Sequence, residues 1–488
     1  MRFERGGGTP IQGMMYVGGR WIDGAGRNAL AVENPADESL IATIPEGVAE
    51  DADVALDAAK AAQPAWAALP AVQRADFVVK LADRVAMRAE ELAQIITMEQ
   101  GKPIGQARGE VGAVLGFLRY HAGNARRIEG DIVSSDNINE EIQIRRHPFG
   151  VVVALTAWNY PAALAARKLA PALVAGNTVV LLSHEVTPLS GLFLALLADE
   201  AGLPAGVFNV VTGRGPVVGR ALVQSRVTSL VTMTGSTRAG KEIFATAAET
   251  LKVLRLELGG KAPFIVMDDA DIDAAVEAAV AARYTNCGQI CTCNERMYLH
   301  RAIAEEFLEK FVLRSSRLTI GDPMTDPDLG PKVNSAEIAK IKEIVDQAVK
   351  AGAEILLPGG PLKDGAFAKG HWYSPTVLSV ADNASPVMQT EVFGPVVAAM
   401  EVESFEQAVA LANDTDYGLS AYVFTRDYRR LMRTPAALKF GEIYFNRANG
   451  EQFQGFHTGW GQSGLGGEDG KYGFDGYLRK QTLYLNWG

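Results

Sequence analysis

Short apolar runs alternate with longer segments of helical length along the chain from about residue 150 onward. The runs are rich in valine and leucine, and helical segments such as 162–175 and 190–201 lie between them. Strands that are apolar throughout and alternate with helices indicate a parallel sheet with both faces covered. The strands expected in this part of the chain are 151–155, 178–182, 207–211, 229–234, 254–258 and 263–267.

The rest of the chain is helical at first and mixed later. Residues 50–130 show apolar positions at helical spacing, with Asp51 or Asp53 expected as a cap for the first helix. A second α/β pattern begins near Asp271, with a helix at 272–282 and strands at 296–300 and 442–446. The last strand, 482–487, has an apolar side, and we expect it to pair with the strand 141–145 as an arm that docks on another subunit.

Length and composition set the class of protein. A chain of 488 residues with 48% hydrophobic and 21% charged residues is too long for one core and predicts two or three globular domains. The net charge of −10 works against nucleic acid or anionic membranes as partners, although it does not exclude an anionic substrate. Residues 1–13 lack the apolar core of an export signal, and the apolar runs are too short to span a bilayer, so we expect a cytoplasmic protein.

The three cysteines lie within one short segment, as Cys287, Cys291 and Cys293. A disulfide scaffold would spread its cysteines along the chain, so this pattern excludes one. The six histidines show no metal-ligand spacing with the cysteines or with each other, and we expect no metal site.

Two segments carry side chains suited to covalent catalysis. Cys291 follows Gly288-Gln-Ile, where a glycine lets substrate and backbone approach the thiol closely, and a thiolate attacks carbonyl groups well. Glu257 lies between two leucines and before two glycines, an apolar setting that raises a carboxyl pKa and suits a general base. Taken alone, each has an ordinary structural interpretation, a buried small thiol and a salt-bridged strand end.

Two further segments follow predicted strands, where α/β folds place ligands. Asn159, after the strand 151–155, can donate an N–H to a developing oxyanion, or it shapes a turn before Pro161. The glycines around Gly235 and Gly215 follow strands and open helices, which suits a pyrophosphate, although neither segment is the dinucleotide fingerprint.

Together these segments resemble the NAD(P)-dependent aldehyde dehydrogenase superfamily, and most closely its lactaldehyde/glycolaldehyde dehydrogenases. The resemblance covers nearly the whole chain and rests on the motifs around Glu257 and Cys291, on Glu391-Val-Phe393-Gly-Pro395, and on the segment from Phe445 to Gly467. It implies an α/β fold with a Rossmann-type parallel-sheet cofactor domain, an α/β catalytic domain and a β oligomerisation arm. The implied limits are 14–135 and 154–264 for the NAD-binding domain, 265–456 for the catalytic domain, and 136–153 and 457–488 for the arm.

The resemblance also implies roles for single residues. Cys291 attacks the aldehyde, Asn159 holds the oxyanion, and Glu257 activates the water that hydrolyses the thioester. Lys168 and Lys261 match positions that are commonly basic in the family, with strand-end packing or helix charge as the structural alternative. The implied cofactor-binding residues are Thr156, Ala157, Trp158, Glu185, Gly215, Gly219, Thr234, Gly235, Ser236, Leu258, Glu391 and Phe393.

One departure from the family concerns the cofactor. The family usually has a lysine where this chain has Leu182, and Leu182 cannot bond the adenosine ribose. Glu185 remains and would repel a 2′-phosphate, so we predict NAD as the cofactor, with weaker binding on the adenosine side or support from His184.

The substrate prediction depends on four residues, which in the subgroup line the substrate pocket: Arg167, Thr292, Glu451 and His457. Such side chains suit a small polar aldehyde with an α-hydroxyl, such as lactaldehyde or glycolaldehyde. Thr292 departs from the asparagine of the subgroup, and Arg167 is compatible with a carboxylate or sulfonate, so acidic and aromatic aldehydes remain alternatives. We expect a homo-oligomer, a dimer or a tetramer.

Three other interpretations stay open. A CoA-acylating dehydrogenase would typically lack Glu257, and a catalytically silent structural homologue would lack Cys291, Glu257 or Asn159. Cys293 is a candidate for a protective disulfide with Cys291, although an inert neighbour is the simpler interpretation.

Overall fold

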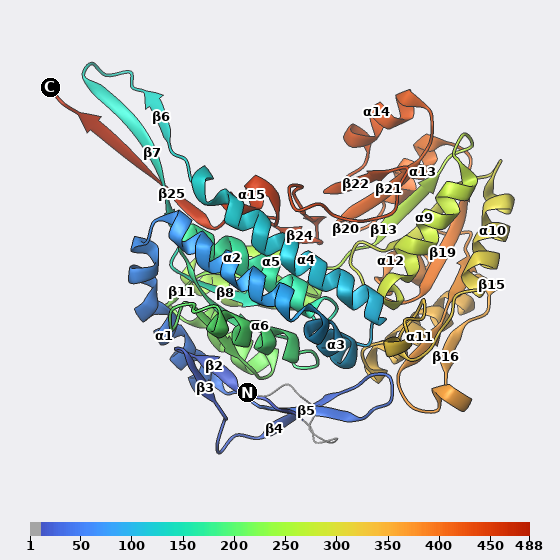
Figure 1. Ribbon diagram of the computed structural model, residues 1–488. Coiled ribbons are helices and arrows are strands. Elements are labelled where there is room, and N and C mark those ends of the chain that lie inside the picture. Colours follow the sequence, from blue (N-terminus) through green and yellow to red (C-terminus); the bar gives the residue numbers. More distant parts are fainter. Residues whose placement is uncertain (1–10) are drawn as a thin grey trace.

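The computed structural model describes residues 11–488 of the chain (Figure 1). Two large sheets covered by helices make up the body, and a β arm projects from it. The segment 1–13, in which we expect no export signal, lies mostly outside the described residues. Within the described part, none of the helices has both the length and the hydrophobicity that a membrane crossing requires.

The first sheet contains five of the six apolar strands that the sequence predicts, each within one residue of its expected limits; the sixth, expected at 263–267, is β13 (Ala262–Val266) of the second sheet. The strands from β12 to β10 in the order below run parallel, while β24, β2 and β3 are added antiparallel at the two edges. The spatial order is β24 (Gly464–Leu465), β12 (Val253–Glu257), β11 (Thr228–Thr234), β8 (Val151–Leu155), β9 (Thr178–Leu182), β10 (Phe208–Val211), β2 (Met15–Val17) and β3 (Arg20–Ile22).

Helices cover both faces of this sheet, which explains why its central strands are apolar on both sides. One face packs against α1 (Ala49–Ala68), α7 (Arg220–Gln224) and α8 (Thr237–Ala247). The other packs against α5 (Pro161–Ala175) and α6 (Leu189–Glu200), and an outer layer follows with α2 (Ala71–Met87), α3 (Ala89–Gln100) and α4 (Ile104–Ala122). The expected cap of α1 was wrong in position: Asp51 lies inside the first turn, where its carboxylate accepts a 2.8 Å hydrogen bond from the Val48 N–H.

The second sheet has its own core between two further layers of helices. Its order is β15 (Glu354–Leu357), β18 (Thr376–Ser379), β19 (Val396–Val402), β14 (Asn294–His300), β13 (Ala262–Val266), β21 (Ser420–Phe424) and β22 (Glu442–Phe445). One face is covered by α9 (Ile272–Tyr284) and α10 (Ala304–Ser316), the other by α11 (Ser335–Lys350), α12 (Pro386–Gln389) and α13 (Phe405–Asn413). Outside these layers lie α14 (Tyr428–Ala437) and α15 (Gly470–Asp475).

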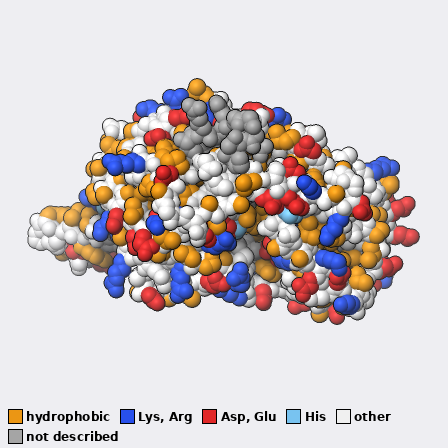
Figure 2. All heavy atoms as spheres, turned by 90° about the horizontal axis from the view of Figure 1, so that it is seen from below, with side chains coloured by type: hydrophobic (Ala, Val, Ile, Leu, Met, Phe, Trp, Pro, Cys, Tyr) orange, Lys and Arg blue, Asp and Glu red, His pale blue; other side chains and the backbone are white. Residues whose placement is uncertain are grey.

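The arm is a sheet of three antiparallel strands, β25 (Leu478–Asn486), β7 (Glu140–Pro148) and β6 (Asp131–Ser134). The expected pairing of the C-terminal strand with the strand 141–145 is confirmed, with Gln481 opposite Arg145. Figure 2 shows the arm projecting from the body at the left with hydrophobic side chains on its surface. Smaller sheets join β1 (Ile11–Gln12), β5 (Leu40–Pro45) and β4 (Ala29–Glu33), β16 (Gly360–Leu362) and β17 (Trp372–Ser374), and β20 (Tyr417–Gly418) and β23 (Trp460–Gly461).

Strand pairing does not follow the predicted domain limits in three places. β8 belongs wholly to the first sheet, although the limit was placed at 153. β13 pairs in the second sheet, so the two sheets separate between Glu257 and Ala262 rather than at 264. β24 joins the first sheet, so the segment after 457 is only partly an arm.

Candidate active site

Cys291 lies on a tightly folded loop between α9 and β14. Asn286, Cys287 and Gly288 all have positive φ, and a Cβ on Gly288 would lie 2.4 Å from the Gly394 carbonyl oxygen, so this turn needs glycine. The Gln289 side chain fixes the loop, because its Oε1 accepts from the Val333 N–H at 3.0 Å and its Nε2 donates to the Asn286 carbonyl at 2.9 Å. The loop therefore holds a half-buried thiol in one place.

Glu257 ends β12 and is only 3% exposed. Among the described residues neither carboxylate oxygen has a hydrogen-bond partner, and a cationic nitrogen, His457 Nε2, lies 3.5 Å from Oε2. Burial raises the pKa of Glu257 to about 8, and the charge of His457 opposes that shift. A buried carboxylate that accepts no hydrogen bond and titrates near neutral pH has the properties of a general base.

Asn159 connects the end of β8 to the nucleophile loop. Its Nδ2 donates to the Gln289 carbonyl at 2.9 Å, and its own carbonyl accepts from Lys102 Nζ at 2.7 Å. A side-chain amide has a second N–H, which stays available for an oxyanion. Asn159 and Cys291 line one cleft, and His457 contacts both Cys291 and Glu257, so the structure brings the three predicted catalytic residues together.

The cleft has a volume of about 950 Å³ and opens along the carboxyl ends of the first sheet. All the cofactor-binding residues expected from the resemblance line it: Thr156, Ala157, Trp158, Glu185, Gly215, Gly219, Thr234, Gly235, Ser236, Leu258, Glu391 and Phe393. Leu182 and His184 line it as well.

The lining suits a dinucleotide. Ser236 caps α8, and the start of this helix faces the cleft with its free N–H groups, a good place for a pyrophosphate. A Cβ on Gly215 would meet open space, and the hydroxyl of Thr156 is buried with no partner among the described residues. Glu391 accepts from the Gly260 N–H at 2.8 Å and has a pKa of about 7, raised by burial.

Some cleft residues were not predicted from the sequence. Arg220 and Val223 of α7 and Glu337 and Lys340 of α11 line the cleft, although α11 belongs to the second sheet's layer. A charged residue on the exposed face of a helix gives no indication in the sequence that it lines a site. Only the packing of the two sheets brings these residues to the cleft.

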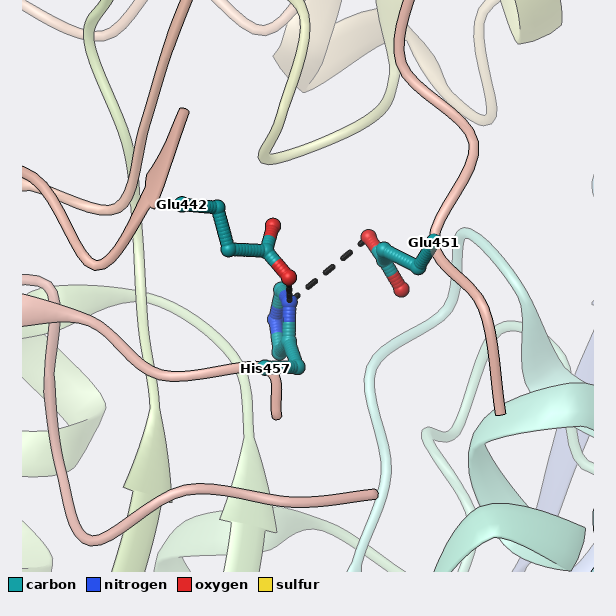
Figure 3. A group of neighbouring side chains, drawn as sticks. All are labelled: Glu442, Glu451 and His457. Carbon is teal, nitrogen blue, oxygen red and sulfur yellow. Dashed lines mark hydrogen bonds and ion pairs between the residues drawn. The ribbon is translucent and has the colours of Figure 1, made fainter. Parts of the chain in front are cut away.

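The predicted substrate residues lie away from the cleft lining, beyond Cys291. Arg167 is 7% exposed, and its Nε donates to Asp469 Oδ1 at 2.9 Å while its Nη2 bonds the other oxygen of Asp469 and lies 3.2 Å from Glu451 Oε2. Thr292 is buried, and its Oγ1 accepts from Asn449 Nδ2 at 3.2 Å. Figure 3 shows the His457 ring between Glu442 and Glu451. The acids Glu442 and Asp469 in this cluster were not predicted.

The two lysines at commonly basic positions have different neighbours. Lys168 Nζ is buried and donates to Thr234 Oγ1 at 2.8 Å and to Glu468 Oε1 at 2.6 Å. Burial alone would raise the pKa of Glu468, but Lys168 and Arg167 bring it down to about 2, so it stays charged near Glu257. Lys261 Nζ donates to Glu295 at 2.6 Å, and Glu295 also accepts from the N–H groups of Val392 and Phe393, so Lys261 is a structural residue.

Cys293 points into the protein. It is 1% exposed, and burial raises the pKa of its thiol to about 12. All three cysteines, which lie in the described part of the chain, are free thiols. A thiol this deep and this basic is unsuited to exchange with Cys291, which argues against the protective disulfide.

Comparisons with known proteins identify the family of the chain. The Aldehyde dehydrogenase family matches residues 21–483. The chain is 47% identical to a 3,6-anhydro-alpha-L-galactose dehydrogenase of Vibrio sp. (strain EJY3), over 97% of this chain and 99% of the relative. It is 42% identical to a lactaldehyde dehydrogenase of Escherichia coli (strain K12), over 98% and 99%.

The solved structure of a 3,6-anhydro-L-galactose dehydrogenase in complex with NAP has a TM-score of 0.95 and 48% identity, and the match covers 97% of this chain and all of that one. The expected fold and the expected resemblance to a lactaldehyde dehydrogenase are therefore confirmed. The chain belongs to the aldehyde dehydrogenase family and is an aldehyde dehydrogenase.

Proposed function

We propose that this enzyme oxidises a small, neutral, hydroxylated aldehyde to the carboxylic acid through a covalent intermediate on Cys291. The observation that carries the proposal is the buried Glu257 carboxylate, which has no hydrogen-bond partner among the described residues and lies 3.5 Å from His457, beside the dinucleotide-sized cleft that Cys291 lines. A nucleophile, an amide donor and a base are the groups that acyl formation and hydrolysis require.

In the first step Cys291 Sγ attacks the aldehyde carbon, and the oxyanion of the thiohemiacetal accepts the free N–H of Asn159. With a nicotinamide dinucleotide held by the residues that line the cleft, the adduct on Cys291 would lose a hydride to it and become a thioester. Glu257 then takes a proton from water, the hydroxide attacks the thioester carbonyl, and the acid leaves as the Cys291 thiol is restored.

We propose NAD rather than NADP as the cofactor. Leu182 offers no bond to the adenosine ribose, and Glu185, which lines the cleft nearby, would accept a bond from a 2′-hydroxyl and repel a 2′-phosphate. The relative solved with NAP shows that a similar fold takes NADP, so the proposal of NAD for this chain depends on the charge of Glu185. Dissociation constants for both dinucleotides test this, and tighter binding of NADP contradicts it.

For the substrate we propose an aldehyde with hydroxyl groups and no net charge. Arg167 is already bonded to Asp469 and lies against Glu451 and Glu468, so it is not free to bind a substrate carboxylate or sulfonate. Glu451 and Glu442 add acceptors for hydroxyl groups nearby. Lactaldehyde and an anhydrogalactose, which the relatives oxidise by name, are both of this class.

We further propose that the chain forms a homo-oligomer through its arm. Tyr484 is 68% and Trp487 66% exposed on or beside β25, and Ile138 in the turn between β6 and β7 is 87% exposed. Apolar side chains on a projecting strand are stabilised by pairing with a second copy. A reducing cytoplasm, in which Cys291 stays a thiol, is the compartment we propose.

NADH formation across glycolaldehyde, lactaldehyde, 3,6-anhydrogalactose, succinate semialdehyde and benzaldehyde tests the proposed function. We expect turnover with the hydroxylated, neutral aldehydes, no need for added CoA, and loss of turnover in Cys291→Ala with dinucleotide binding retained. NADH formation that requires CoA, or a preference for the acidic semialdehyde, contradicts the proposal.

A further inference from the structure

His457 lies between two carboxylates on one edge of its ring (Figure 3). Nδ1 bonds Glu442 Oε1 at 3.2 Å and lies 3.7 Å from Glu451 Oε1. The His457 backbone is fixed too, because its N–H donates to the Glu468 carbonyl at 2.9 Å and its carbonyl accepts from the Glu468 N–H at 2.7 Å. At 3% exposure the ring has little freedom to turn.

The opposite edge of the His457 ring faces Glu257 and Cys291. Nε2 lies 3.5 Å from Glu257 Oε2, and the imidazole is close enough to the Cys291 thiol to lower the pKa of that thiol. One ring therefore contacts both the nucleophile and the general base, while its remaining nitrogen is occupied by carboxylates.

We propose that Glu442 is a positioning residue that holds His457 as an imidazolium. The positive charge of this ring then stabilises both the Cys291 thiolate and the Glu257 carboxylate. The inference rests on the proposed function and deepens it. When Cys291 is activated, its S–H bond breaks and the proton passes to solvent water; the thiolate that remains is stabilised by the imidazolium, whose Nδ1–H stays on Glu442.

Glu442 is better placed for this than Glu451. Glu442 is on β22, its side chain is 14% exposed, and its second oxygen accepts from the Tyr444 hydroxyl at 2.9 Å. Glu451 is farther from Nδ1, is 26% exposed, and lies 3.2 Å from Arg167. Glu442 is therefore the carboxylate that is hydrogen-bonded to His457 Nδ1 and fixes the ring.

The balance of charge around the ring favours its protonated form. Burial by itself would lower the pKa of His457, but the charges of Glu451, then Glu442 and Glu257, raise it well above its usual value against the opposing charge of Arg167. Burial raises the pKa of Cys291, and the bond and charge of His457 lower it. The ionisable groups that face the ring are Glu257 on β12, Glu442 on β22, Arg167 on α5, and Cys291, Glu451 and Asp469 on loops.

A bound metal ion is the alternative arrangement, because Glu442, Glu451 and His457 place ligand atoms within 4.8 Å of one another. Arg167 already pairs with Glu451, and an imidazolium proton occupies the place of the ion. The experiment below separates the two arrangements.

The test is the rate at which iodoacetamide alkylates Cys291 between pH 5 and 10, in enzyme free of aldehyde and dinucleotide. Fragmentation of the labelled peptide in the mass spectrometer shows how much of the label is on Cys291 rather than on Cys287 or Cys293, which are both buried. We expect Glu442→Gln and His457→Asn to react about tenfold more slowly at pH 7, with the midpoint of the profile moved up by about one pH unit. Glu442→Asp should restore most of the rate.

The matched control is Glu354→Gln, an exposed carboxylate on β15 at the opposite edge of the same sheet, which should react like the wild type. Superimposable profiles for Glu442→Gln and wild type, or a slower rate with an unmoved midpoint, would overturn the proposal. So would zinc or another metal that is retained through dialysis against EDTA and lost in Glu442→Gln. Failure of the proposed function would appear separately, as a wild type that makes no NADH from any aldehyde.

Discussion

The pKa of Glu257 sets a specific pH dependence for the hydrolysis of the acyl-enzyme. With a pKa of about 8, about a tenth of the Glu257 carboxyl is ionised at pH 7 and about nine tenths at pH 9. If the carboxylate is the base, the rate constant for deacylation rises about tenfold over that range. His457 is the charge that keeps this pKa from rising further, so His457→Asn should move the rise to higher pH.

The perturbation is Glu257→Gln, which keeps the shape of the side chain and removes the base. Loss of a general base typically lowers a rate by about 10²–10⁴-fold. The assay is a single turnover with p-nitrophenyl acetate, in which intact-mass spectrometry follows the decay of the acetyl-enzyme at pH 6 to 10. Formation of the acetyl-enzyme should survive the change, while its decay slows and loses the rise near pH 8. A variant that deacylates as fast as the wild type, with the same pH profile, refutes the assignment of the base.

Three further predictions concern stability, cofactor and assembly. Because burial raises the pKa of Glu257 from 4.5 to about 8, the folded enzyme keeps a proton that the unfolded chain loses, and stability falls as pH rises through that window by up to about 5 kcal/mol. The gap in melting temperature between Glu257→Gln and wild type should therefore widen from pH 5 to pH 8, and a constant gap contradicts the argument. Leu182→Lys adds a donor at the adenosine end of the cleft and should tighten NAD binding about tenfold by titration calorimetry, whereas unchanged affinity would mean that Leu182 does not face the ribose. Replacing Leu485 and Trp487 by lysine should lower the mass of the particle measured by light scattering. The control Met87→Lys, at a position 74% exposed on α2, should leave that mass unchanged. Equal masses for the wild type and both variants would exclude the arm as the interface.

The apolar strands of the first sheet could be read from the sequence because parallel strands covered on both faces show as uninterrupted apolar runs. β8 and β9 begin and end where the pattern predicts. The apolar pattern does not predict the sheet to which a strand belongs. β13 is a buried strand like β8 and β9, yet it pairs with β14 and β21 in the second sheet. Which strands pair depends on the path of the chain between them, and the spacing of apolar residues does not predict that path.

The candidate site shows the same limit. Cys291, Glu257 and Asn159 lie in recognisable motifs. In the structure Asn159 and Cys291 line one cleft, and Glu257 lies 3.5 Å from His457 beside it. Glu442 and Asp469 lie in segments where an acid looks like an ordinary surface residue, and only the fold turns them toward His457 and Arg167. Lys261 looked equally suited to the site, but its bond to Glu295 makes it a support for the loop at Phe393.

The central claim is that the acid is released from a thioester on Cys291. Glu257→Gln mixed with NAD and glycolaldehyde, quenched in acid and digested, tests it most directly. We predict that the peptide containing Cys291 gains the mass of the aldehyde less two hydrogens, with about one NADH formed per subunit. An adduct on another residue, or steady NADH formation with an unmodified Cys291 peptide, would contradict the account.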